Sequence, residues 1–267
     1  MAKILLDKYY TSDELAKYCV EKTKEIIGEY NITEYLEPSA GTGVFLKYLD
    51  KPYLAYDIEP EGENIVQADY LTLDLDYKKG RCIIGNPPFG GSNKKDNNLF
   101  IDFLNKSIEL GDYIAFILPI RQLNNPIMFY KFDLLYSEDL KMQEYTDRKL
   151  RCCFNIYGMP KNGLNKVKPI FDLKDVTIEE HHRTRNPLLN NNYDYRMCSF
   201  GSSLGKKCEA NTYCKEYCFT IEDDFKKEVI HLLESTDFKK VFPSVSTPYV
   251  SKWQIYKYIK EQIPEIE

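Results

Sequence analysis

The sequence predicts an α/β fold built on a doubly wound, mostly parallel sheet. Short apolar runs alternate along the first half of the chain with segments whose apolar residues recur at helical spacing. This alternation is typical of parallel sheets that carry helices on both faces. The apolar runs also stop abruptly at an acidic residue or at a Gly-Asn-Pro turn, and such strand ends are where open α/β sheets bind their ligands.

The expected elements follow from these patterns. A helix begins at Thr11 or Ser12, either of which can act as N-cap, and Glu14 completes a capping box with Thr11. The run at 113–119 is apolar enough for a central strand that is buried on both faces. For the first half we expect helices over 15–27, from about 44 and over 99–108, and strands over 35–37, 53–56, 65–68, 82–84 and 113–119.

Three successive strands are expected to end in an acidic residue, namely Glu37, Asp57 and Asp69. The carboxyl ends of parallel strands share one edge of a sheet, so these carboxylates are expected to line that edge. Asp57 lies where a ribose-binding carboxylate is expected after a glycine loop, although an acid that merely caps a strand is common. Glu37 at a strand end suits a cationic ligand and would repel a phosphate.

A glycine-bearing loop, 38–43, follows the first of these strands. Gly41 and Gly43 lack a Cβ where the backbone must turn sharply and allow a ligand to approach. The loop has neither the third glycine of the dinucleotide fingerprint nor the Gly-Lys-Ser/Thr of a P-loop. A nicotinamide-dependent dehydrogenase and a P-loop enzyme are therefore disfavoured.

The stretch Asn86-Pro87-Pro88-Phe89 follows the fourth strand. Two consecutive prolines cannot continue a strand ladder or enter a helix interior, because neither donates an N–H and both fix φ. The chain is therefore held stiffly just past the strand, where an amide, a carbonyl and an aromatic ring suit a planar ring that bears an amino group. A tight turn with a core phenylalanine is the simpler alternative. The polar stretch 90–98 is expected to be a loop that substrate orders.

Beyond Pro119 the periodicity loosens. We expect strands over 150–157 and 194–200 and amphipathic helices over 223–233 and 251–262. No linker clearly divides the chain, so we expect one domain over 1–200 and a small helical extension over 201–267 packed on it. The span from Lys141 to Arg185 is predicted to be a nucleic-acid face, or else an ordinary solvated face, and contains Tyr145, Arg148, Lys149, Arg151, Phe154, Tyr157, Lys161, Lys166, Lys168, Phe171, Lys174 and Arg183.

Composition excludes several classes of protein. The net charge of −5 at pH 7 supplies no bulk field for a polyanion, so any nucleic-acid contact must be local. No apolar run is long enough to span a membrane, and the N-terminus lacks a signal peptide, so we expect a cytoplasmic protein. No metal site is predicted, because the clustered cysteines lack C-x-x-C spacing, although a site among them stays open: Cys198, Cys208, Cys214 and Cys218.

Together, the loop Glu37-Pro38-Ser39-Ala40-Gly41-Thr42-Gly43 and the stretch Asn86-Pro87-Pro88-Phe89 resemble the cofactor loop and catalytic motif of N6-adenine DNA methyltransferases of the gamma motif order. The helix opened by Tyr10-Thr11 resembles their N-terminal cofactor motif. The resemblance covers the chain to about Leu118. It implies a seven-stranded Rossmann-like methyltransferase sheet, S-adenosyl-L-methionine as cofactor, and double-stranded DNA whose target base is flipped out of the duplex.

The resemblance also implies roles for residues. Asn86 and the Pro87 carbonyl, stiffened by Pro88, would accept the hydrogens of the target amino group, and Phe89 would stack on the target base. The cofactor-binding residues that it implies are Tyr10, Thr11, Glu37, Pro38, Ala40, Gly41, Gly43, Asp57, Ile58, Asp69, Tyr70 and Asn86.

Several alternatives stay open. The Asn-Pro-Pro motif is shared with RNA-adenine and protein-glutamine methyltransferases; Phe89, where the glutamine enzymes usually have Tyr, disfavours the latter. A non-catalytic cofactor-binding subunit would have no reason to keep the Asn86 amide. The second half has no room for a large recognition domain, so recognition, for example in restriction–modification, would fall to the short basic region or to a protein partner.

Overall fold

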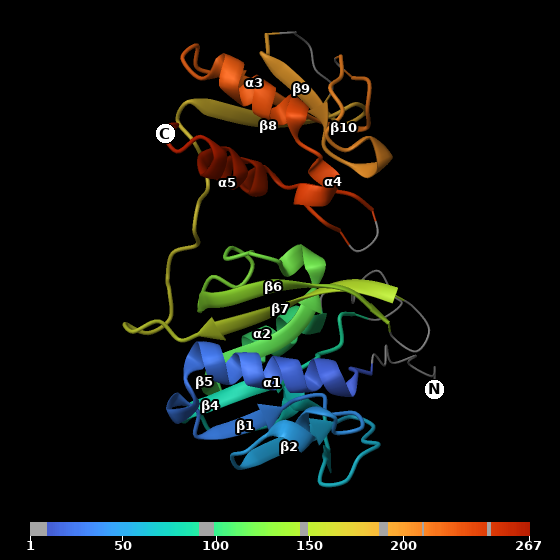
Figure 1. Cartoon of the computed structure of the whole chain (residues 1–267), viewed down its shortest axis with the longest axis vertical. Coiled ribbons are helices and arrows are strands. Elements are labelled where there is room, and N and C mark those ends of the chain that lie inside the picture. Colours follow the sequence, from blue (N-terminus) through green and yellow to red (C-terminus); the bar gives the residue numbers. More distant parts are fainter. Residues whose placement is uncertain (1–9, 91–98, 145–148, 187–191, 210, 245–246) are drawn as a thin grey trace. The chain divides into compact units, whose positions relative to one another are not determined.

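The computed structural model describes residues 10–90, 99–144, 149–186, 192–209, 211–244 and 247–267. The chain divides into two compact units, residues 1–169 and residues 170–267 (Figure 1). The division falls after Pro169 and not at residue 200, where the sequence suggested a boundary, because residues 176–198 supply strands to the sheet of the second unit. The packing of the C-terminal part on the first domain stays a prediction.

The first unit contains the seven-stranded sheet, in the strand order β3-β2-β1-β4-β5-β7-β6. The first five strands in this order run parallel, whereas β7 is antiparallel to both of its neighbours. The predicted fold class, a mostly parallel seven-stranded α/β sheet, is confirmed. The elements are α1 (Asp13–Ile27), β1 (Glu34–Glu37), β2 (Tyr53–Asp57), β3 (Val66–Gln67), β4 (Lys78–Gly85), α2 (Leu99–Ser107), β5 (Gly111–Pro119), β6 (Asp133–Glu144) and β7 (Lys149–Gly158), with short 3-10 turns at Glu29–Asn31, Phe45–Tyr48, Tyr70–Thr72 and Ile120–Gln122.

Helices cover both faces of this sheet. The buried side of α1 includes Ala16, Cys19 and Val20, which pack with strand residues in one apolar layer. The buried side of α2, with Phe100 and Phe103, packs in the layer on the other face. Alternate residues of β5 contribute to the two layers, so β5 is the central buried strand that its sequence predicted.

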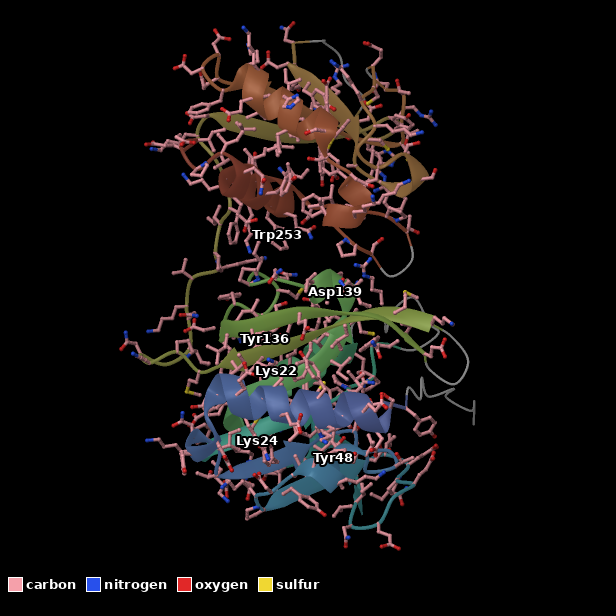
Figure 2. The ribbon with its side chains drawn as sticks, viewed as in Figure 1. Lys22, Lys24, Tyr48, Tyr136, Asp139 and Trp253 are labelled. Carbon is pink, nitrogen blue, oxygen red and sulfur yellow. The ribbon has the colours of Figure 1, made fainter. Side chains whose placement is uncertain are left out.

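The start of α1 differs in detail from the expectation. Ser12 is the N-cap, and its hydroxyl accepts a hydrogen bond from the Leu15 N–H at 3.3 Å. The capping box predicted for Thr11 and Glu14 is therefore wrong. In the first turn, the Asp13 carboxylate accepts hydrogen bonds from the Lys47 ammonium and from the hydroxyl of Tyr48, which Figure 2 labels. These contacts fasten the N-terminal end of α1 to the segment that follows the glycine loop.

Two further expectations in this unit are corrected. The helix expected from about residue 44 is only a 3-10 turn, Phe45–Tyr48, because Leu49 is already extended. The long strand β6 was not predicted, since its residues are mostly polar or half-buried. No helix among the residues that the structure describes is long and apolar enough to cross a membrane.

The second unit has its own core. Its antiparallel sheet has the order β8-β10-β9, and helices pack on it through an apolar cluster that includes Phe219, Val229, Ile255 and Ile259. The extension is therefore α/β and not simply helical, as was expected. Its elements are β8 (Val176–His182), β9 (Tyr195–Cys198), a 3-10 turn (Gly201–Ser203), β10 (Lys215–Ile221), α3 (Lys226–Ser235), α4 (Phe238–Val241) and α5 (Lys252–Gln262).

Candidate active site

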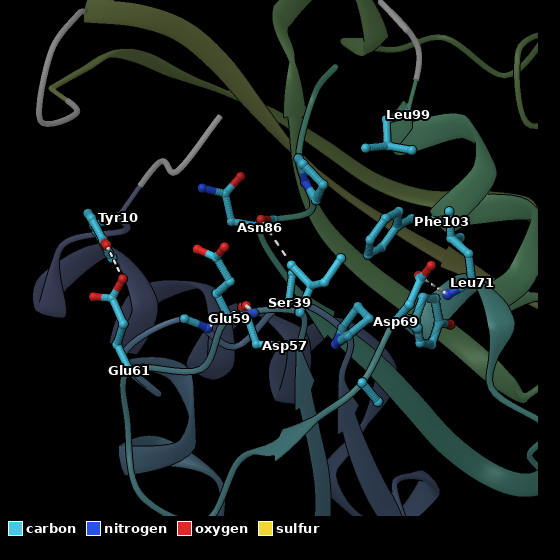
Figure 3. A pocket seen from close by; sticks show the side chains of 16 residues that line it. Tyr10, Ser39, Asp57, Glu59, Glu61, Asp69, Leu71, Asn86, Leu99 and Phe103 are labelled. Atoms are coloured by element: carbon cyan, nitrogen blue, oxygen red, sulfur yellow. Dashed lines mark hydrogen bonds between the residues drawn. The ribbon is translucent and has the colours of Figure 1, made fainter. Parts of the chain in front are cut away.

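A pocket of about 250 Å³ lies at the carboxyl ends of the parallel strands of the first unit (Figure 3). This volume is close to the lower end of the range of small-molecule sites, roughly 300–1,000 Å³. It also lies where ligands bind in open α/β sheets. The pocket is lined by Tyr10, Pro38, Ser39, Gly41, Asp57, Ile58, Glu59, Glu61, Ala68, Asp69, Tyr70, Leu71, Asn86, Pro88, Leu99 and Phe103.

Asp57, the last residue of β2, shapes the glycine loop. Its Oδ2 accepts a hydrogen bond from the Gly41 N–H at 2.7 Å, and its Oδ1 accepts one from the Glu59 N–H at 2.8 Å. Gly41 has φ of 53° and Gly43 has φ of 78°, a backbone region that glycine adopts at little cost. A single carboxylate thus holds both the loop after β1 and the turn after β2 against the pocket.

The charged residues in the pocket lining are all acidic. They are Asp57, Glu59, Glu61 and Asp69, and no lysine, arginine or histidine occurs among the described lining residues. Asp69 accepts a hydrogen bond from the Leu71 N–H at 3.0 Å, which fixes the turn after β3. A site of this kind attracts a cation and repels a phosphate.

Glu37 ends β1 but lies behind the pocket and is not part of its lining. The side chain is buried, and its Oε2 has no hydrogen-bond partner among the described residues. Burial, and secondarily the negative charge of Asp57, hold the pKa of Glu37 well above its usual range. The row of three acids predicted for one edge of the sheet therefore has two members in the pocket and one beneath it.

The apolar end of the pocket comes from two elements. Tyr70 is buried, its hydroxyl lies 2.9 Å from the Ser107 hydroxyl, and its ring lies 5.3 Å from that of Phe103. Leu71 and Leu99 complete this end (Figure 3). Ile58 also lines the pocket and is half exposed.

Asn86 stands at the end of β4 in the middle of this arrangement (Figure 3). Its Nδ2 donates a hydrogen bond to the Thr11 hydroxyl at 3.2 Å, and its backbone carbonyl accepts one from the Ser39 hydroxyl at 3.3 Å. These bonds connect the stretch after β4 to the N-terminal segment and to the glycine loop. With Nδ2 directed to Thr11, the other end of the amide, Oδ1, is the acceptor end.

The two ends of the Asn86 stretch have different surroundings. Pro88 lines the pocket, whereas Pro87 and Phe89 do not. Phe89 packs against the apolar layer that contains α1. Most of the loop expected over 90–98 lies outside the described residues.

Tyr10 reaches across the pocket from the N-terminal segment. Its hydroxyl donates a hydrogen bond to Glu61 Oε1 at 2.7 Å, and both residues line the pocket (Figure 3). This contact joins the segment before α1 to the turn after β2.

We expect Tyr10→Phe to weaken binding of the pocket's ligand by about three- to tenfold, because one hydrogen bond that holds the two sides together is lost. The ring and its packing remain. Titration calorimetry with S-adenosylmethionine measures the change, and Tyr30→Phe, at a fully exposed tyrosine, is the control. Equal affinities for Tyr10→Phe and the wild type would contradict this role of the hydroxyl.

The structure brings together nine of the residues that the sequence singled out, as pocket lining: Tyr10, Pro38, Gly41, Asp57, Ile58, Asp69, Tyr70, Asn86 and Pro88. Thr11, Glu37, Ala40, Gly43, Pro87 and Phe89 lie outside the lining, although Thr11 contacts Asn86. Sequence reasoning missed Ser39, Glu59, Glu61, Ala68, Leu71, Leu99 and Phe103. The signal for Leu99 and Phe103 was present, since both belong to the predicted helical stripe.

The predicted nucleic-acid face is partly corrected. Phe154 and Tyr157 are fully buried, so these aromatic rings are not interleaved with the cations on a surface. Arg151 and Lys149 form ion pairs with Asp139 and Glu144. Tyr145 and Arg148 lie outside the described residues. For the cysteines, no group of three histidine, cysteine or acidic side chains able to hold a metal ion occurs within the described ranges.

The chain is similar in sequence to the type II methyltransferase M.CvrRI of Paramecium bursaria Chlorella virus XZ-6E. The two are 30% identical over 139 residues, which make up 42% of this chain and 36% of that protein. The matched segment thus spans about a third of the length of this relative. No family model matches the chain.

Solved structures with similar folds include methyltransferases. A candidate RNA methyltransferase from Pyrococcus horikoshii is 18% identical, covers 59% of this chain and 90% of its own, and has a TM-score of 0.47. The tRNA m1G37 methyltransferase of M. jannaschii is 18% identical, covers 58% of this chain and 52% of its own, and has a TM-score of 0.40. At TM-scores below 0.5 these likenesses carry no conclusion about activity.

Proposed function

We propose that this chain is a methyltransferase that transfers the methyl group of S-adenosylmethionine to the N6 amino group of adenine in DNA. The observation that carries this proposal is the position of Asn86 and Pro88, after β4, in the same pocket as Gly41, Asp57 and Asp69. Both halves of the sequence resemblance, the cofactor loop and the catalytic stretch, thus contribute to one cavity. The 30% identity to a type II methyltransferase supports the same class of enzyme.

The lining residues fit this cofactor. S-adenosylmethionine carries an ammonium and a sulfonium and no phosphate, which suits a pocket whose charged lining residues are acidic. Asp57 and Glu59 would face the ribose hydroxyls, and Ile58 would pack on the adenine. Asp69 would accept from the adenine amino group, and buried Glu37 would complement the positive charge of the methionine part. When bound, the cofactor supplies an electrophilic methyl group on a sulfonium.

Asn86 would act on the second substrate. Its Oδ1 and the Pro87 carbonyl would accept the two hydrogens of the target amino group, which aims the nitrogen lone pair away from the ring. Pro87 and Pro88 fix the backbone between these two acceptors, so little reorganisation is needed at the moment of reaction. The nitrogen forms a bond to the methyl carbon as the carbon–sulfur bond breaks, and the nitrogen then releases one proton to solvent.

Positioning accounts for most of the catalysis in this scheme. Holding two reactants in line can contribute several orders of magnitude in rate without a metal or a strong base. The Thr11 and Ser39 hydroxyls, which contact Asn86, would keep the acceptor in place.

Labelled methyl transfer tests the proposed function. The purified chain is incubated with S-adenosylmethionine carrying a labelled methyl group and, separately, with duplex DNA, folded RNA and a protein mixture. We expect label in DNA, and N6-methyladenine in its nucleoside digest. Label in RNA or protein but never in DNA would contradict the proposal.

A further inference from the structure

The β6–β7 hairpin continues past the sheet edge on which the pocket opens. Strand β5 ends at Pro119, which pairs with Cys152, whereas β6 and β7 continue to pair through Met142 with Arg151 and Glu144 with Lys149. Residues 142–144 and 149–151 therefore form a two-stranded ribbon beyond the last pairing with β5, here termed the hairpin overhang.

The overhang stands close to Asn86 at that edge. Gly85 pairs with Phe116, which pairs with Asn155, so the end of β4 is level with Asn155 of β7. Two strand spacings separate β4 from β7, or about 10 Å, and Arg151 lies about 10 Å further along the strand direction than Asn86. The overhang thus rises beside the rim of the pocket.

The base of the overhang is braced by Asp139. The Asp139 carboxylate accepts hydrogen bonds from Arg151 Nη2 at 2.5 Å, from the Lys141 N–H at 2.8 Å and from Lys141 Nζ at 3.1 Å. The strand pairing shifts between Asp139 and Lys141, where Lys141 has φ of 64°. A bulge of this kind re-aims a strand, and Asp139, labelled in Figure 2, holds the bulge in one form.

A second brace ties the hairpin to the first helix. Tyr18 of α1 and Tyr136 of β6 both donate hydrogen bonds to Glu138 Oε2. The Lys22 ammonium lies 5.6 Å from the centre of the Tyr136 ring (Figure 2 labels both). The overhang therefore projects from a rigid base.

The side chains presented outward are cationic or apolar. The side chains of Lys141 and Lys149 are 76% and 64% exposed, and Met142 is 55% exposed. Of the two acids that pair with these lysines, Asp139 is only 13% exposed and Glu144 is 72% exposed. The exposed charge near the tip is thus two lysines against one glutamate among the described residues.

We propose that the hairpin overhang enters the major groove of duplex DNA next to the base that is delivered to Asn86; this rests on the proposed function and narrows its substrate to a DNA duplex. The B-form major groove is about 12 Å wide and 8.5 Å deep and admits a two-stranded ribbon. Three residue pairs extend about 10 Å, which matches that depth. The major groove of an RNA duplex is too narrow for side chains to read, so the same ribbon does not fit RNA.

Charge reversal on the overhang tests this inference. We compare the double variant Lys141→Glu with Lys149→Glu against the control Lys79→Glu with Lys131→Glu, which makes the same charge change at exposed lysines at the opposite sheet edge. Affinity for a fluorescent DNA duplex is measured by anisotropy over a range of salt concentrations. We expect the overhang variant to lose about 10- to 100-fold in affinity and about two units of salt slope, and the control about threefold or less.

Further measurements keep the outcome decisive. Binding of S-adenosylmethionine by the overhang variant should equal that of the wild type, which shows that the pocket is intact, and Lys141→Gln with Lys149→Gln should lose less affinity than the charge reversal. A DNA loss no greater than in the control, or wild-type binding of an RNA duplex as tight as that of DNA, would overturn the inference. If the overhang variant loses DNA affinity as expected but the wild type transfers no methyl group, the overhang inference stands and the proposed function fails.

Discussion

Replacement of Asn86 by alanine is expected to lower the rate of methyl transfer about a thousandfold while the affinity for S-adenosylmethionine changes by less than about threefold. The substitution removes one of the two oxygens proposed to orient the target nitrogen. Losing a single preorganised hydrogen bond to a reacting group typically costs about 10²- to 10³-fold, and a misplaced substrate adds to this. Single-turnover transfer to DNA and calorimetry with the cofactor measure the two effects separately.

Two further substitutions sharpen this result. Asn105→Ala, at an exposed position of α2, is the matched control and should transfer methyl groups at the wild-type rate. Thr11→Val removes the hydroxyl that receives Asn86 Nδ2 and should lower the rate about tenfold, because the amide is less firmly oriented. An Asn86→Ala variant that retains more than a tenth of the wild-type rate would exclude the proposed role of the amide.

The first half of the fold could be predicted because its signals are local. The strands that carry the site are short apolar runs with an abrupt end, as in the residues before Asp57 and Gly85. The second half lacks such signals. Strand β6 alternates between exposed and half-buried residues, and β8 contains Glu179, Glu180, His181 and His182, so neither has an apolar run to detect.

The site divides in the same way. Asp57, Asp69 and Asn86 could be predicted because each directly follows a strand, and strand ends share an edge. Glu61 could not, since it enters the pocket only when the turn after β2 folds back: the Glu61 N–H donates to the Gly41 carbonyl at 2.9 Å. Whether an acid lies in the pocket or beneath it depends on side-chain packing, which explains why Glu37 was expected at the rim and is buried instead.

Glu37→Gln is expected to make the first unit more stable above about pH 5 and to flatten the dependence of its stability on pH. In the unfolded chain the Glu37 carboxyl has its ordinary pKa, about 4.5, whereas burial and then Asp57 raise the pKa in the folded chain. Between these two pKa values the folded chain holds a proton that the unfolded chain has released. Stability therefore falls as pH rises through this window, by about 1.4 kcal/mol per pH unit, and glutamine removes this dependence.

Urea unfolding from pH 5 to 8 measures this effect. The only tryptophan, Trp253, lies in the second unit, so its fluorescence follows that unit, and hydrogen exchange of the β1 and β4 amides follows the first. The change should appear in the exchange data and not in the fluorescence. Glu21→Gln, at an exposed position of α1, is the control. Parallel pH profiles for Glu37→Gln and the wild type would contradict the raised pKa.

The same substitution should weaken S-adenosylmethionine binding about 10- to 100-fold, because a buried carboxylate that faces a cation is lost. For the wild type, affinity should increase with pH within the window, since a cationic ligand favours the ionised form of Glu37 and binding then releases its proton. In Glu37→Gln this pH dependence should disappear. An acid retained at a buried position where it lowers the stability of the free protein is best explained by a ligand that carries positive charge, and a variant that gains stability without losing affinity would refute that explanation.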